Sequence, residues 1–407
     1  MKSKILTPVL VIGAGLSGLA CAQALARRKI PVTVLEAQER VAEPWRARHP
    51  ALRLNIHRHF AGLPGQKAPT SDGAFLKRDT VVTHLDRYAS RLDVPIRFGV
   101  EVTAVARSCG GWLVSTTADL YEAAHIVIAS GRERVPYIPD WPGREEFAGE
   151  LLHVADLGDV SRFNHKCVLV VGAGNSGSDA LNHLARHQPN EVLVSVRHGP
   201  ALVPARVFGF PLHLLASVFA ALPAGLRDPA FRGVQRLFLG KLDRHGLRCH
   251  PDGGGTRLLR DGVAFAIDDG FVAALKSGRF RILPCVERFE RTCVRLADGS
   301  TCTPDVVIVA TGYRTGLAPL LGHLGALDDM GLPRLPMGEP DPRNPDLWFT
   351  GFRPTFTGYF DAARIAAGRI AARIGVEARR TGLNKPTDLQ VAGVATERTG
   401  CAGASGP

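Results

Sequence analysis

Two glycine-rich turns of the same form, GAGLSG at 13–18 and GAGNSG at 172–177, lie far apart in this chain. Each follows a run of aliphatic residues, 8–12 and 166–171, and each opens a segment with helical spacing of apolar residues. In a strand–turn–helix unit, the first glycine makes the tight turn, the second lets a pyrophosphate approach the backbone, and the third lets helix and strand pack closely. Two such units predict two dinucleotides on one chain, and hence electron transfer between them.

The residue that ends the next strand of each unit distinguishes the two sites. After the first turn, the predicted strand 32–35 ends at Glu36, which would accept hydrogen bonds from ribose hydroxyls and repel a 2′-phosphate. After the second turn, the predicted strand 191–196 ends at Arg197, a cation that suits a 2′-phosphate. The first site therefore suits the adenosine of FAD or NAD, and the second suits NADPH. The alternatives are a solvated Glu36 and an Arg197 that only faces solvent.

The composition indicates a large enzyme of ordinary globular character. The 407 residues have room for two domains, and hydrophobic and charged residues make up 45% and 22%. Of the 50 basic residues, 41 are Arg and they are spread along the chain, so the net charge of +12 does not indicate a nucleic-acid partner. The eight cysteines form no C-x-x-C pair and no zinc-type spacing, which excludes a disulfide reductase and predicts no metal. Without a secretory leader before the first strand, we expect a cytoplasmic protein with reduced thiols.

Alternating strand and helix signals predict an α/β fold with parallel sheets, in which the NADPH domain is inserted into the FAD domain. Both would be dinucleotide-binding, Rossmann-like domains. Predicted strands lie at 100–105, 112–116, 125–131, 305–312 and 346–351, and a helix at 362–374. The expected boundaries are 1–150 for the first part of the FAD domain, 151–303 for the NADPH domain with a helical insertion at about 200–245, 304–380 for the return to the FAD domain, and 381–407 for a disordered tail.

One apolar segment, 207–226, has the length of a membrane span. Pro211 and Pro223 interrupt it and His213 lies within it, so a helical cap over the substrate entrance, or a weak interfacial contact, is favoured over a stable span.

Several stretches together resemble the class B flavin-containing monooxygenases. The family pattern F-x-G-x-x-x-H-x-x-x-[YF] is matched by Phe147, Gly149 and His153, with Leu157 where an aromatic residue is usual. Within the family the chain is most similar to the YUCCA-type monooxygenases and their bacterial relatives, through 240–247, 275–281, 309–315 and 358–362. The resemblance implies FAD, NADPH and O₂, a C4a-(hydro)peroxyflavin as oxidant, and oxidative decarboxylation of an aromatic 2-oxo acid such as indole-3-pyruvate.

The resemblance also carries roles onto individual residues. Asn55 and Arg58 match the family's N-x-x-K near the reacting face of the flavin, where the Asn would hydrogen-bond the oxygenated intermediate; an ordinary loop is the alternative. Trp45 stands beside the flavin or is a core aromatic, and Asp361 contacts FAD or caps its helix. His153 is expected to be structural, tying the linker to the NADPH domain. The residues expected to bind the cofactors are Gly13, Gly15, Gly18, Glu36, Trp45, Gly172, Gly174, Asn175, Ser176, Gly177, Arg197, Thr311, Gly312 and Asp361.

The sequence thus predicts a flavin-dependent monooxygenase whose partners are a small-molecule substrate and O₂. N- or S-oxygenation, or Baeyer–Villiger oxygen insertion on a small lipophilic metabolite, stays open as an alternative, and so does a flavoprotein that only carries electrons. The oligomeric state is not predicted.

Overall fold

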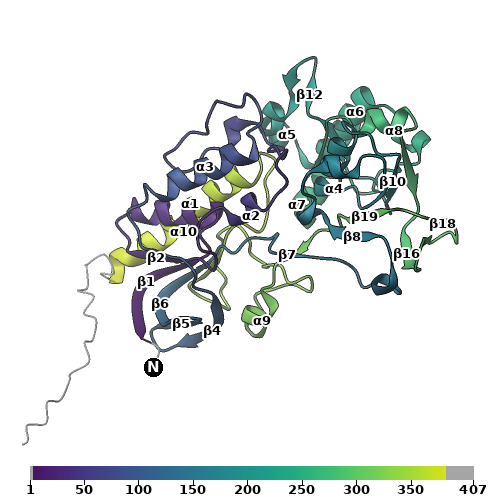
Figure 1. Ribbon diagram of the computed structural model, residues 1–407. Coiled ribbons are helices and arrows are strands. Elements are labelled where there is room, and N and C mark those ends of the chain that lie inside the picture. The colour runs from purple at the N-terminus through teal and green to yellow at the C-terminus, as the bar shows by residue number, and fades with distance from the viewer. Residues whose placement is uncertain (1–2, 382–407) are drawn as a thin grey trace, which may run out of the picture.

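The computed structural model describes residues 3–381; the predicted tail at 381–407 lies, apart from the end of the last helix, outside the described residues. Two sheets form separate lobes, seen side by side in Figure 1, with the earliest and latest parts of the chain in one lobe and the middle in the other. The predicted α/β class is confirmed, with a wholly parallel second sheet and a first sheet in which β4, β5 and β6 pair antiparallel.

The first sheet has the strand order β3-β2-β1-β6-β5-β4. Its last strand, β21, pairs in parallel with the carboxyl half of β6 although it follows the whole second sheet in sequence. The second lobe is therefore an insertion between two neighbouring strands of the first. The strands are β1 (Lys4–Ile12), β2 (Val32–Leu35), β3 (Ile96–Arg97), β4 (Val102–Ser108), β5 (Gly111–Thr116), β6 (Leu120–Ile128) and β21 (Leu347–Phe349).

The second sheet is wholly parallel, in the order β15-β10-β9-β19-β8. Parallel strands buried on both faces read as continuous aliphatic runs, as β19 does with Val306, Val307, Ile308 and Val309 all fully buried. The strands are β8 (Glu150–His153), β9 (Cys167–Val171), β10 (Glu191–Ser195), β15 (Phe280–Leu283) and β19 (Val306–Val309).

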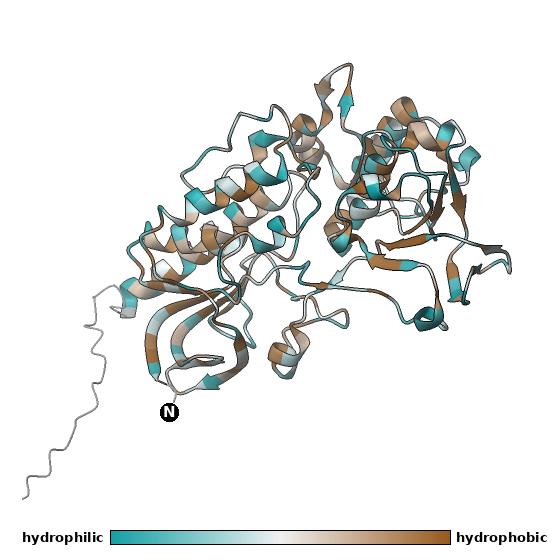
Figure 2. Ribbon diagram, viewed as in Figure 1, coloured by the Kyte–Doolittle hydropathy of each residue, from teal (hydrophilic) through white to brown (hydrophobic). Residues whose placement is uncertain are grey.

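Helices pack on the sheets and contribute apolar residues to both cores, and Figure 2 shows strands that are largely brown and helices of mixed colour. In the first lobe, α1 packs against α10 in a core that includes Leu19, Leu25, Ala363 and Ile370. The helices are α1 (Leu16–Ala26), α2 (Glu43–Arg46), α3 (Arg78–Ala89), α4 (Asn175–Leu184), α5 (Ala216–Ala221), α6 (Ala224–Leu239), α7 (Gly254–Asp261), α8 (Phe271–Lys276), α9 (Ala318–Leu321) and α10 (Tyr359–Thr381).

The two crossings between the lobes pair with each other. Strand β7 (Val135–Pro136), on the way out, is antiparallel to β20 (Tyr313–Arg314), on the way back. The remaining short strands are β11 (Leu202–Pro204), β12 (Arg206–Val207), β13 (Phe210–Pro211), β14 (Ala266–Asp268), β16 (Val286–Phe289), β17 (Val294–Leu296) and β18 (Thr301–Cys302).

The apolar segment 207–226 is not one helix. It forms the β12–β13 hairpin, a 3-10 turn at Leu212–Leu215, and α5, and ends where Pro223 precedes α6. The prolines break it because proline lacks the backbone donor that a helix interior needs. Within residues 3–381, no helix has both the length and the apolar character needed to cross a membrane.

Candidate active site between two glycine loops

The first glycine of each loop has the backbone that the fingerprint requires. Gly13 has φ +107° and Gly172 has φ +96°, in the region that favours glycine. A Cβ on Gly13 would lie 2.7 Å from Ala129 O, and one on Gly172 would lie 2.6 Å from Ala310 O. The two loops thus turn in the same way against the end of the neighbouring strand, β6 in one lobe and β19 in the other.

The other two glycines of each loop have different roles: one lets the helix pack on the turn, and one leaves space for a ligand. A Cβ on Gly18 would overlap Gly13 O, and one on Gly177 would overlap Gly172 O, so these glycines let the helix sit on the turn. Around the middle glycines, Gly15 and Gly174, a Cβ would meet no atom within 4 Å. The amino-terminal ends of α1 and α4 are therefore open on the side where a phosphate would bind.

Glu36 is already joined to the first loop. Its Oε2 accepts a hydrogen bond from Ala14 N at 2.7 Å, and its Oε1 accepts one from Gln38 N at 3.0 Å. At the equivalent end of β10 the exposed Arg197 has no hydrogen bond or ion pair with any residue in 3–381, which leaves its guanidinium free for an anion. An acid at one site and an unpaired cation at the other is the contrast that the sequence predicted.

Asn55 connects the two lobes. Its Nδ2 donates to Oδ1 of Asn175, the first residue of α4, at 2.5 Å. The next residue, Ile56, packs against the turn before α10, where a Cβ on Gly358 would lie 2.5 Å from its side chain. Asn55 therefore lies between the beginning of α4 in the second lobe and the turn before α10 in the first.

The other predicted residues nearby have more ordinary surroundings. Trp45, on α2, is half-buried and packs against the first core. Arg58 is half-buried in the 3-10 turn Arg58–Phe60 and its side chain bonds no other residue in the described range. Asp361, in the first turn of α10, accepts from Thr357 Oγ1 at 2.6 Å and from Arg364. These contacts leave the roles of all three as predictions.

Thr311 and Gly312 belong to the crossing between the lobes. Thr311 Oγ1 donates to Tyr137 O at 2.5 Å, and Gly312 O accepts from His153 Nε2 at 3.0 Å. Because Nδ1 of His153 accepts from Ala155 N, the proton lies on Nε2. Both ring nitrogens of His153 are therefore bonded. Burial lowers the pKa of His153, and the hydrogen bond to Gly312 O opposes this shift. His153 is thus held in the structural position expected of it.

The insertion at about 200–245 contacts the 55–60 loop through His213. His213 Nδ1 accepts from His57 N at 3.3 Å, and its ring meets Phe60 edge to face at 5.4 Å. Burial, and then the neighbouring His57, lower the pKa of His213 to about 4, so the ring is neutral at pH 7; a hydrogen bond with the Phe356 backbone opposes the shift. One neutral ring therefore joins the 55–60 loop, the insertion and the 352–358 loop.

Beyond His213, aromatic rings stack beside Arg227, which is half-buried. Phe231 lies 4.7 Å from Phe219 and 4.2 Å from Phe265, with interplanar angles of 25° and 24°, and 6.1 Å from Phe356. The Arg227 guanidinium lies 5.8 Å from the Phe356 ring centre. Nη2 of Arg227 donates to Ala220 O, but its buried Nε has no partner among the described residues.

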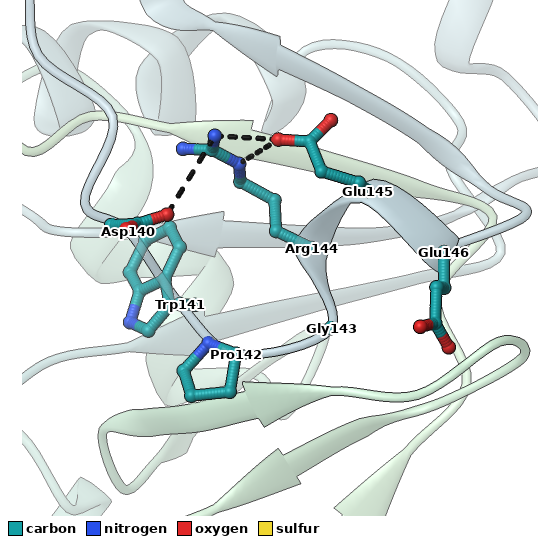
Figure 3. Close-up of a pocket in the computed structure, with 7 residues that line it drawn as sticks. All are labelled: Asp140, Trp141, Pro142, Gly143, Arg144, Glu145 and Glu146. Carbon is teal, nitrogen blue, oxygen red and sulfur yellow. Dashed lines mark hydrogen bonds and ion pairs between the residues drawn. The ribbon is translucent and has the colours of Figure 1, made fainter.

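Two cavities differ in their relation to this site. One, of about 60 Å³, opens at the junction of the lobes and is lined by Asn55, Phe75, Asp179, Asn182 and His183 among others. A larger hollow of about 350 Å³ is bounded only by the linker residues 140–146. In Figure 3, Arg144 of that linker faces Asp140 and Glu145, and no residue of either glycine loop takes part, so this hollow has no role in the site.

Sequence reasoning missed three polar residues of α4: Asn182, which bonds within the second lobe, and Asp179 and His183, which face the first. Asn182 Oδ1 accepts from Asp269 N and Phe271 N, and its Nδ2 donates to Ile267 O at 2.7 Å. Asp179 and His183 meet His49 of the first lobe. Their spacing of four residues on a predicted helix was the available signal, but their partner is too distant in sequence to be foreseen. All seven cysteines within 3–381 are free, in agreement with the absence of a C-x-x-C pair.

Comparisons with known proteins agree with this geometry. A family model described as pyridine nucleotide-disulphide oxidoreductase matches residues 10–203. The indole-3-pyruvate monooxygenase YUCCA1 of Oryza sativa subsp. japonica is 34% identical over 323 residues, covering 78% of this chain and 79% of the relative. The chain belongs to the class B flavin monooxygenase family.

Solved structures show the same fold for this flavin monooxygenase. The flavin-containing monooxygenase from Stenotrophomonas maltophilia has a TM-score of 0.69 at 22% identity, covering 92% of this chain and 99% of the other. Cyclohexanone monooxygenase from Rhodococcus sp. Phi1 bound to NADP⁺ has a TM-score of 0.65 at 18% identity, covering 93% and 85%. The protein is thus a flavin-dependent monooxygenase with the Rossmann-like sheets of that family.

The first loop of this flavin monooxygenase has the features that an FAD needs. Besides the open Gly15, two buried hydroxyls beside it, Ser130 Oγ and Thr350 Oγ1, bond no other described residue. Ser130 follows the strand end that Gly13 packs against, and Thr350 precedes Gly351, where a Cβ would lie 2.7 Å from Ser17 Oγ of α1. Buried hydroxyls are normally bonded, so these two fit a polar ligand at this loop.

Proposed function

We propose that this flavin monooxygenase binds FAD at the Gly13–Gly18 loop and NADPH at the Gly172–Gly177 loop. The support is the contrast between Glu36, bonded into the first loop, and Arg197, unpaired beside the second. A guanidinium binds a 2′-phosphate with charge-assisted hydrogen bonds, whereas a carboxylate repels it. FAD would thus lie in the unit built from residues 1–150 and 304–380, and NADPH in the unit 151–303.

We further propose oxidative decarboxylation of an aromatic 2-oxo acid of the indole-3-pyruvate type. The name of the rice relative supports this substrate class, at 34% identity. Phe265 is half-buried and stacks on the buried Phe231, and Arg227, near the Phe356 ring, has an unpartnered buried Nε. An aromatic 2-oxo acid has a ring that can stack on these side chains and a carboxylate that can pair with the guanidinium.

When bound, NADPH supplies a hydride, and the reduced flavin supplies the electrons that activate O₂. The chain's own residues position and shield this chemistry. Asn55 holds the first turn of α4 against the flavin side through its bond to Asn175. His213 keeps the insertion over the 57–60 turn and carries no charge at pH 7 that would draw water into the site. Exclusion of water favours oxygen transfer over loss of the oxidant as H₂O₂.

The observation that carries the proposal is the Asn55–Asn175 hydrogen bond, because it joins the 55–58 segment of the first lobe to the glycine loop of the second. The test measures NADPH consumption, product and H₂O₂ with four substrates: indole-3-pyruvate, a thioether, a tertiary amine and a cyclic ketone. We expect the 2-oxo acid to give the acetic acid and CO₂ with most of the NADPH coupled to product. Coupled turnover of the thioether, amine or ketone, with only H₂O₂ from indole-3-pyruvate, would assign the protein to the alternative oxygenations.

A further inference from the structure

A cluster of three polar side chains joins the lobes beside the Asn55–Asn175 bond. His49 comes from the segment after α2, while Asp179 and His183 lie one turn apart on α4. His49 Nε2 is 2.8 Å from Asp179 Oδ2, and His183 Nε2 is 3.7 Å from Asp179 Oδ1. The two imidazole rings meet edge to face with centres 4.6 Å apart. The cluster therefore connects segments that are 130 residues apart in the chain.

The donor set is that of a transition-metal site. Two imidazoles and one carboxylate are ligands of zinc-class ions, and the ligating atoms of these three residues all lie within 4.8 Å of one another. A tetrahedral ion with bonds of about 2.0–2.1 Å holds its ligand atoms ~3.3 Å apart. The separations of 2.8 Å from His49 to Asp179 Oδ2 and of 3.7 Å from His183 to Asp179 Oδ1 lie on either side of that value.

Hydrogen bonds alone leave the cluster incomplete. The His183–Asp179 separation of 3.7 Å is beyond hydrogen-bond reach, although His183 is buried and its side chain is 9% exposed. The Asp179 carboxylate is only 19% exposed and lies between the two imidazoles. A largely buried carboxylate with an imidazole beside each of its oxygens offers a divalent cation ligands on both sides.

There is also room for a solvent ligand. The cavity of about 60 Å³ at the lobe junction has Asp179 and His183 on its wall, and one water takes about 30 Å³. Arg186 lines the same cavity, but its charge is paired with Asp269. A fourth coordination position and a route for the ion are therefore available beside the cluster.

We propose that His49, Asp179 and His183 bind a divalent transition-metal ion of the zinc class between the two lobes. The ion ties the segment that leads to Asn55 onto the helix that begins at Asn175. Metal binding in this way is separate from the catalytic proposal, because it requires neither a substrate nor turnover.

The test uses untagged, FAD-loaded full-length enzyme, treated with a chelator and then titrated with ZnCl₂ by calorimetry and by thermal melting. We expect one zinc per chain and a higher melting temperature with zinc. His49→Ala and His183→Ala should each weaken zinc binding by more than ~10-fold, since even residues outside the ligand set change metal affinity by that factor. His245→Ala, at an exposed histidine, is the matched control and should bind zinc as the parent does.

Asp179→Asn separates a metal site from a hydrogen-bonded one. The amide keeps the shape and the acceptor oxygen toward His49 but loses the charge, so zinc affinity should fall by more than ~10-fold. FAD content and circular dichroism verify that each variant is folded; where an alanine variant is not, Asp179→Asn decides. Absence of one-to-one zinc binding to the parent, or unchanged affinity in folded Asp179→Asn, overturns the proposal and leaves the cluster as a hydrogen-bonded contact.

Discussion

Gly174, the middle glycine of the second loop, allows nucleotide binding to be changed without changing the fold. Its backbone, φ −63° and ψ −165°, is one that alanine adopts, and a Cβ there would meet no atom within 4 Å. Gly174→Ala replaces a glycine N-cap by alanine, which costs at most about 1 kcal/mol. We therefore expect a folded, FAD-containing protein whose melting temperature falls by no more than about 4 °C.

NADPH binding should change far more than stability. The added methyl group would occupy the side of the loop where the pyrophosphate approaches the backbone. Losing one hydrogen bond to a charged group, at about 1.5–3 kcal/mol, corresponds to a rise of about 10- to 100-fold in KM for NADPH. The flavin should stay bound, because the substitution is in the other lobe.

Two matched variants complete the design. Gly15→Ala stands at the equivalent place in the first loop, with φ −74° and nothing within 4 Å, and should lower FAD content while NADPH binding by the FAD-loaded fraction is retained. Gly177→Ala is the steric control: its Cβ would overlap Gly172 O, so it should lower the melting temperature instead of changing KM selectively.

The assay measures KM for NADPH by oxygen-dependent NADPH oxidation, FAD content by absorbance, and melting temperature. The crossed pattern, in which each variant affects only its own nucleotide, is the expected result. The reasoning fails if Gly174→Ala loses FAD, or if its KM for NADPH rises less than about 2-fold in a folded protein.

Three further predictions concern single side chains. Arg197→Ala should raise KM for NADPH by about 10- to 100-fold and leave KM for NADH unchanged, with His198→Ala as control; equal effects on both nucleotides would remove Arg197 from 2′-phosphate recognition. Asn55→Ala should lower coupled turnover by about 10- to 100-fold and divert NADPH oxidation to H₂O₂, at unchanged FAD content; normal coupling would show that the Asn55–Asn175 bond is dispensable. His213 has a pKa of about 4 when folded and about 6.5 when unfolded, so its contribution to stability is full above pH 6.5 and is lost as pH falls toward 4. Between pH 7.5 and 5.5 this loss is about 1 kcal/mol, and His213→Gln should remove that part of the pH dependence of urea unfolding; an identical dependence in the variant would contradict the assignment.

The local parts of the fold could be predicted from the sequence because local patterns determine them. The two fingerprints give the same turn with the same glycine roles, and the aliphatic runs at 32–35 and 166–171 are strands β2 and β9. Glu36 was predicted because its distance from the glycine turn fixes its place at the end of the adjacent strand.

Contacts across the lobes could not be predicted in the same way. Asn55 and Asn175 were each assigned to the site, but nothing local indicates that one donates to the other. His49, Asp179 and His183 meet only because the second sheet is inserted between β6 and β21 and folds back on the first. The 207–226 segment was difficult for another reason. Its contacts with His57 and Phe60 are made by His213, while apolar residues such as Phe208 and Val218 are exposed, so its pattern does not follow one helix period.

The most direct test of the account is turnover of indole-3-pyruvate with NADPH under ¹⁸O₂. The proposed reaction consumes one O₂ and one NADPH for each acid decarboxylated, and places one oxygen atom in the new carboxylate and one in water. We predict indole-3-acetate with a single ¹⁸O, formed in equal amount to CO₂ and NADP⁺. Unlabelled acid, or NADPH oxidation that yields only H₂O₂ with this and every other substrate offered, would contradict the account.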